Sequence, residues 1–208
     1  MKDIDIYKWK RKKYYEYYQA FDNPTFSLNV NIDITCLIAH IKKEKLKFFP
    51  TFLYCLMKAI NEVDEFKYRI RSNRVVLHDI VHPSFTVLNN DEQYVFCEAV
   101  FNDDFLTFYN QTIKNIEIAY SGNNLEDEEG KDDLIFISSL PWISFTGLTQ
   151  PFSKNEPLSI PRVTFGKYFE EDSTIKLPFS IQVHHGLVDG LHVAKLLNKI
   201  TEAINSLK

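Results

Sequence analysis

The segment 181–190 places two adjacent histidines, His184 and His185, before a Gly-Leu-Val-Asp-Gly sequence that ends at Asp189 and Gly190. Imidazole titrates near neutral pH, which suits a general base that removes a proton from an attacking group. Apolar residues before the pair predict a strand, and the residues after Gly190 predict a helix. A connection of this kind can fix one imidazole tautomer by bonding a ring nitrogen to backbone. Asp189 is near along the chain, but its spacing alone does not make it a proton relay.

Strands are expected on both sides of this connection. Residues 26–34 alternate apolar and polar side chains, which is typical of a strand with one buried face. The other expected strands are residues 75–77, 85–88, 94–100, 134–138, 162–165 and 175–183. A turn at residues 89–91 joins two of them.

Helices are expected between these strands without a strict βαβ order. They are residues 10–20, a helix capped by Thr35, a helix opened by Pro50 and reaching Ile60, a helix capped by Asn102 or Asp103 and reaching about Ile118, and residues 190–207. This mixture predicts an α+β fold, a two-layer sandwich around a mixed β-sheet, in a single domain over residues 1–208.

Composition excludes several classes of protein. The net charge of −4 disfavours a nucleic-acid partner, and neither GxGxxG nor GxxxxGK[ST] occurs. The stretch 121–133 is polar and acidic and is expected to be a solvated loop. It lacks the spacing of a calcium loop, and no metal site is predicted. The cysteines are far apart, the first residues contain no apolar leader, and no stretch is long enough to span a membrane. We therefore expect a soluble cytoplasmic protein with no membrane partner.

The paired histidines match a known motif. The segment resembles the HHxxxDG motif of the chloramphenicol acetyltransferases, which is related to the HxxxDG motif of other CoA-dependent acyltransferases and of condensation domains. Other stretches resemble the same family in the same order: Trp9-Lys10-Arg11-Lys12, Phe26-Ser27-Leu28, Ile32-Asp33-Ile34, Lys47-Phe48-Phe49-Pro50, Phe85-Thr86-Val87, Leu140-Pro141-Trp142-Ile143-Ser144-Phe145 and Thr164-Phe165-Gly166-Lys167-Tyr168. The resemblance covers almost the whole chain.

The resemblance implies a catalytic role for three residues. His185 would take the proton from the acceptor hydroxyl while that hydroxyl attacks the thioester of acetyl-CoA. Asp189 would pair with Arg11 and brace the loop that carries His185, without relaying a proton. A shielded pair of this kind is costly to break, because one charge is left without its partner.

The resemblance also implies binding sites for two substrates. Acetyl-CoA is the co-substrate, and no permanently bound cofactor is expected. Lys47 and Lys167 match positions near the CoA phosphates, and Tyr168 matches a position beside the pantetheine tunnel. The assembly would be a homotrimer with each active site at a subunit interface.

The acceptor side matches the family in part. Tyr18, Thr86 and Thr164 match positions that line the chloramphenicol pocket. Gly147, however, stands where many family members carry a serine whose hydroxyl stabilises the oxyanion. Loss of such a donor typically costs on the order of 10²–10³ in rate, so Thr146 or an ordered water would have to replace it.

Three alternatives remain beside acetylation of chloramphenicol. A transferase of the same fold could act on another hydroxyl or amine, which the change at Gly147 favours. A catalytically silent trimer could bind an apolar ligand. The catalytic core of a dehydrogenase-complex acyltransferase is disfavoured, because the sequence contains neither a lipoyl domain nor its linker.

Overall fold

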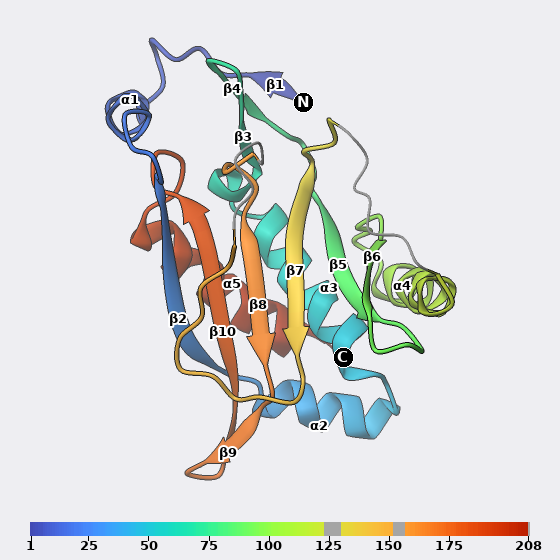
Figure 1. Ribbon diagram of the computed structural model, residues 1–208. Helices are drawn as coiled ribbons and strands as arrows, with labels where there is room; N and C mark the ends of the chain where they lie inside the picture. The colour runs from blue at the N-terminus through green and yellow to red at the C-terminus, as the bar shows by residue number, and fades with distance from the viewer. Residues whose placement is uncertain (123–129, 152–156, 208) are drawn as a thin grey trace.

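The computed structural model describes residues 1–122, 130–151 and 157–207, and its centre is a mixed seven-stranded sheet (Figure 1). The strand order is β2-β10-β8-β7-β5-β6, and β9 pairs with β10. The strands are β2 (Thr25–Asp33), β5 (His82–Leu88), β6 (Tyr94–Glu98), β7 (Leu134–Leu140), β8 (Arg162–Gly166), β9 (Phe169–Glu171) and β10 (Thr174–His184). Strand β7 runs parallel to β5 and β8, and the other pairs are antiparallel.

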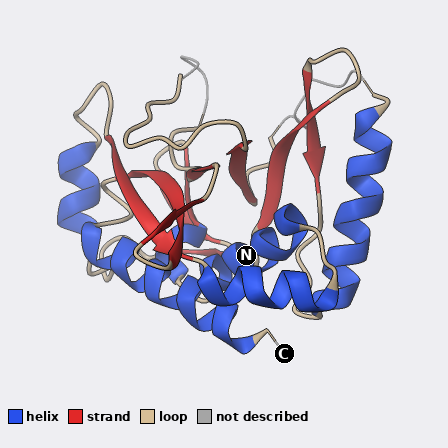
Figure 2. Ribbon diagram, turned by 90° about the horizontal axis from the view of Figure 1, so that it is seen from below, coloured by secondary structure: helices blue, strands red, loops and turns tan. Residues whose placement is uncertain are grey.

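Helices cover one face of this sheet (Figures 1 and 2). They are α2 (Thr35–Glu44), α3 (Phe48–Asn61) and α5 (Gly190–Ser206), while α4 (Phe105–Tyr120) packs beside β5 and β6 and α1 (Lys12–Tyr18) lies outside the sheet, near the start of β2. Under α3 and α5, strand β10 contributes Phe179, Ile181 and Val183, which are at most 1% exposed. The expected two-layer α+β fold is confirmed.

The opposite face of the sheet is rich in polar side chains. The register pairs Ser180 of β10 with Asn29 of β2 on one side and with Thr164 of β8 on the other. Directly paired residues share a face, so these side chains point away from the helices. The connection from β7 to β8 crosses this polar face (Figure 1).

A second, three-stranded sheet lies near α1 and the start of β7. Its order is β1-β4-β3, with β1 at Lys2–Asp3, β4 at Arg74–Leu77 and β3 at Tyr68–Arg71. A 3₁₀ helix, η1 (Asp64–Lys67), precedes β3. The sequence predicted β4, but β1 and β3 were missed because they have only two and four residues.

Four expected details of the helices are wrong. Helix α1 is shorter than residues 10–20, because after Gln19 the amides of Ala20 and Phe21 donate to carbonyls three residues back instead of continuing the α-helical pattern. Thr35 is the first residue of α2 rather than its cap, and the carboxylate of Asp33 accepts hydrogen bonds from the Thr35 amide and hydroxyl. Those bonds lower the pKa of Asp33.

The other two corrections concern α3 and α4. Pro50 lies in the first turn of α3, where a missing N–H costs little, and the helix begins two residues earlier at Phe48. Asp104, rather than Asn102 or Asp103, caps α4 by accepting a hydrogen bond from the Thr107 amide at 2.8 Å.

Three further expectations concern the acidic stretch, the cysteines and membrane spans. Most of the acidic stretch 121–133, for which a loop was expected, lies outside the described residues. Cys36, Cys55 and Cys97 are free thiols. None of the helices in the described part of the chain is both long enough and apolar enough to cross a membrane.

Candidate active site

His185 directly follows the last residue of β10, where its backbone amide donates to the Pro24 carbonyl at 2.8 Å. The imidazole stacks on Tyr18, with ring centroids 4.4 Å apart and planes 14° apart, and it contacts Phe26 at 4.5 Å. Nδ1 is shielded from solvent and lies 3.9 Å from Oδ1 of Asp189, beyond hydrogen-bond distance. The side chain is 36% exposed, so the nitrogen left for a substrate to reach is Nε2.

Arg11 and Asp189 brace the segment that carries His185. Two nitrogens of the guanidinium bind the two carboxylate oxygens of Asp189 at 2.6 and 2.9 Å, and one of them also donates to the His185 carbonyl at 3.3 Å. The hydrogen bonds from Arg11 lower the pKa of Asp189. Arg11 is at the N-cap position of α1 and Asp189 is at that of α5, so the pair joins the starts of two helices. The structure brings together all three residues that the resemblance assigned to catalysis.

His184 has a different environment from its neighbour. It is 6% exposed, and its Nδ1 accepts a hydrogen bond from the Gly186 amide at 3.1 Å. A Cβ at Gly186 would lie 2.9 Å from this ring and 3.2 Å from the backbone of Tyr15, so only glycine allows this close approach. His184 is a packed residue that shapes the turn.

Acid should destabilise the protein through His184. Burial lowers its pKa from 6.5 to about 4. As pH falls from 6.5 towards 4, the unfolded chain binds a proton that the folded protein does not, so stability is lost over that window. His184→Asn keeps an acceptor for the Gly186 amide and does not titrate. Urea unfolding at pH 7 and 4.5 should show a loss about 2 kcal/mol smaller for this variant than for wild type.

His40→Asn is the matched control, because His40 is a partly exposed histidine on α2. It should lose as much stability on acidification as wild type does. Equal losses in His184→Asn and wild type would contradict a buried neutral His184.

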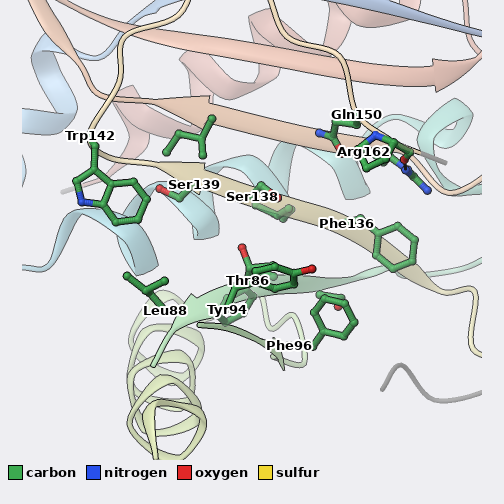
Figure 3. A pocket seen from close by; sticks show the side chains of 15 residues that line it. Thr86, Leu88, Tyr94, Phe96, Phe136, Ser138, Ser139, Trp142, Gln150 and Arg162 are labelled. Carbon is green, nitrogen blue, oxygen red and sulfur yellow. Dashed lines mark hydrogen bonds between the residues drawn. The ribbon is translucent and has the colours of Figure 1, made fainter. Parts of the chain in front are cut away.

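A cavity of about 740 Å³ opens on the polar face of the sheet, over β5, β6 and β7 (Figure 3). Its lining includes four aromatic residues, which are Tyr94, Phe96, Phe136 and Trp142. Polar side chains lie among them, namely Thr86, Ser138, Ser139, Gln150 and Arg162 (Figure 3). Thr86 therefore lines this cavity, as the resemblance implied for the acceptor pocket. A cavity lined by both kinds of side chain suits a small aromatic molecule that carries polar groups.

The cavity and His185 are separate within one chain. His185, Arg11, Asp189 and Tyr18 are not among the described residues that line it. Most of the lining residues, which lie on β5, β6 and β7, were not predicted from the sequence. The expected strands were the available signal, but only the register shows which of their residues lie around one cavity.

Thr164 does not reach the cavity in this chain. It is 1% exposed, and Gln150 covers it by donating from Nε2 to the Thr164 hydroxyl at 2.6 Å. Thr146 and Gly147 lie exposed in the same connection between β7 and β8. That connection is held close to the sheet at Gly166, where a Cβ would lie 2.7 Å from the Ile143 carbonyl oxygen.

The three residues implied for CoA binding lie together at one end of the sheet. Lys47 directly precedes α3, and Tyr168 contacts Phe48 of α3 with ring centroids 5.5 Å apart. Lys167 is exposed beside Tyr168, and its amide donates to the Ile143 carbonyl at 2.8 Å. This is the end at which β8 finishes, opposite the end of β10 that carries His185 (Figure 1). Phe165 of β8 pairs with Phe179 of β10, so about 20 Å of extended strand leads from that level to His185.

The fold and the paired-histidine connection define an acyltransferase, and comparison with known proteins agrees. The model of the family described as chloramphenicol acetyltransferase matches residues 1–201, so the chain belongs to this family. Similar proteins include chloramphenicol acetyltransferases from Clostridium perfringens, 34% identical over 96% of this chain and 92% of the relative, and from Escherichia coli, 32% identical over 96% and 91%. A solved chloramphenicol acetyltransferase structure superposes with a TM-score of 0.91 at 28% identity, covering 98% of this chain and all of that one. The resemblance seen in the sequence is confirmed.

Proposed function

We propose that the protein transfers the acetyl group of acetyl-CoA to a hydroxyl of chloramphenicol, with His185 as the general base, and so confers resistance to the antibiotic. The observation that carries the proposal is the braced, half-exposed imidazole of His185 in a chain of this family. Free thiols are consistent with action in the cytoplasm.

The reaction would take place in one direct transfer with no acyl-enzyme. Nε2 of His185 takes the proton as the acceptor oxygen attacks the thioester carbonyl. The tetrahedral intermediate then collapses, the carbon–sulfur bond breaks, and the same proton passes from the imidazolium to the departing thiolate of CoA. Arg11 and Asp189 hold the His185 backbone, so the ring keeps its orientation through both proton transfers.

A homotrimer accounts for the distance between the base and the cavity. In one chain the cavity over β5, β6 and β7 has no described contact with His185. If the cavity of one subunit faces His185 of the next, chloramphenicol in the cavity can present its hydroxyl to Nε2. Lys47, Lys167 and Tyr168 would then hold the other end of acetyl-CoA.

Release of free CoA thiol from acetyl-CoA, with and without chloramphenicol, tests this function. We expect release that depends on chloramphenicol and a trimer by light scattering. Release with another hydroxyl or amine, but not with chloramphenicol, would support the transferase with a different acceptor. No release with any acceptor would support the silent ligand-binding trimer.

Gly147→Ser should raise kcat if this position lacks an oxyanion donor. A Cβ added at Gly147 meets nothing within 4 Å, so a serine fits without displacing a neighbour. Its hydroxyl would act on charge that develops in the transition state, so kcat should rise about tenfold with little change in either KM. Steady-state kinetics with both substrates would measure this.

Gly147→Ala is the matched control, because it adds the same Cβ without a hydroxyl. It should leave kcat near the wild-type value. If the serine variant trimerises normally and also shows no gain, another group already stabilises the oxyanion.

A further inference from the structure

His192 lies in the first turn of α5, directly behind the His185 loop. Its side chain is buried, with 7% of the residue exposed. Nδ1 accepts a hydrogen bond from the Asp189 backbone amide at 2.9 Å. Nε2 lies 3.3 Å from Oε1 of Glu65, in the 3₁₀ helix η1. The ring therefore connects the start of α5 to a different element of the fold.

These contacts define the tautomer of His192. A backbone amide only donates, so Nδ1 has to be unprotonated in order to accept from Asp189. The neutral ring then carries its proton on Nε2, where it faces the carboxylate of Glu65. A second proton on Nδ1 would remove the acceptor and place two N–H groups opposite each other.

We propose that His192 is a positioning residue for catalysis, which fixes the Asp189 backbone and thereby the Arg11 brace and the loop of His185. The order of contacts is Glu65 to His192, His192 to the Asp189 amide, and Asp189 to Arg11. Arg11 closes the series by donating to the His185 carbonyl. The inference depends on the proposed function only where kcat is measured. The contacts themselves can be tested without any turnover.

Among the described residues, four charged groups act most strongly on His192. Glu65 of η1 and Asp189 favour protonation of the ring, and Arg11 and Lys195 oppose it. Burial is the largest effect, and the pKa of His192 is lowered from its ordinary value. The ring is therefore neutral and able to accept at neutral pH. Acidification should release the Asp189 amide once His192 gains a proton.

Two substitutions at His192 separate positioning from packing. His192→Gln keeps a side-chain acceptor at the third helical position, as glutamine does in a capping box, and His192→Leu fills similar space without one. We expect the leucine variant to lose about tenfold in kcat with unchanged KM for acetyl-CoA, and to exchange the Asp189 amide hydrogen about tenfold faster. The glutamine variant should stay within about threefold of wild type on both measures. Equal impairment of both variants, or none in either, overturns the proposal.

Glu65→Gln supplies a readout that packing alone would not move. It retains an oxygen opposite Nε2 but removes the charge that favours protonation of His192. The NMR signal of the Asp189 amide, followed from pH 8 to pH 5, should change at lower pH in this variant than in wild type. An unchanged titration would contradict the contact. If wild type transfers no acetyl group, the proposed function fails, while amide exchange and this titration still test the positioning of Asp189.

Discussion

His185→Ala is expected to lower kcat for acetyl transfer by about 10²–10⁴-fold, the usual contribution of a positioned general base. In the described structure, the ring of His185 offers a substrate one reachable nitrogen, and its shielded Nδ1 has no hydrogen-bond partner. KM for acetyl-CoA should change little, because the residues implied for CoA binding lie at the other end of the sheet. Stopped assays with saturating substrates would measure the loss.

The fold should survive this substitution. The His185 amide and carbonyl, which bind Pro24 and Arg11, belong to the backbone and remain in place. His40→Ala, on α2 at the far end of the molecule, is the matched loss of an imidazole and should retain wild-type activity. A folded His185→Ala protein with more than a tenth of wild-type kcat would disprove the assignment of the base.

Local patterns were sufficient to predict most of the sheet. The alternation in residues 26–34 predicts β2, because side chains on a strand point to opposite faces in turn. The apolar run before His184 likewise predicts β10. Helix ends were less predictable, since Asp33 and Asp104 compete with neighbouring residues for the same backbone donors and only the folded geometry selects them.

The candidate site likewise contains contacts that could be predicted from the sequence and contacts that could not. Arg11 and Asp189 are 178 positions apart, and it was the family resemblance, not any local pattern, that predicted their contact. The covering of Thr164 by Gln150 depends on the path of the connection between β7 and β8, which no periodicity encodes. His192 was missed because a histidine on the buried side of a helix gives no sign, in sequence, of the amide that it accepts from.

The side chains that line the cavity determine which kind of acceptor can bind there. Its lining places the hydroxyls of Thr86, Ser138 and Ser139 among aromatic residues, so a wholly apolar ligand buried there would remove water from these hydroxyls. An aromatic molecule with polar substituents, such as chloramphenicol, can contact the rings and also bind the hydroxyls. This favours the transferase over a binder of apolar ligands.

Arg11→Met should be the most destabilising of these changes and should also lower kcat. Methionine replaces the stem of the side chain but leaves the Asp189 carboxylate and the His185 carbonyl without their donor. Breaking a fully buried pair costs about 3–5 kcal/mol. Asp189 is 35% exposed on its side chain and can recover some hydration, so we expect about 2–3 kcal/mol by urea unfolding.

Lys12→Met is the matched control for the lost charge. Lys12 is the next residue along the chain and pairs with Glu16 at 3.7 Å on the surface of α1, so its loss should cost no more than about 0.5 kcal/mol.

Asp189→Asn should lower stability and kcat in the same direction as Arg11→Met. The two changes combined should cost less than the sum of their separate costs, because they remove one shared interaction. Additive costs, or an Arg11→Met protein with the stability and kcat of the Lys12→Met control, would show that the pair does not hold the His185 loop.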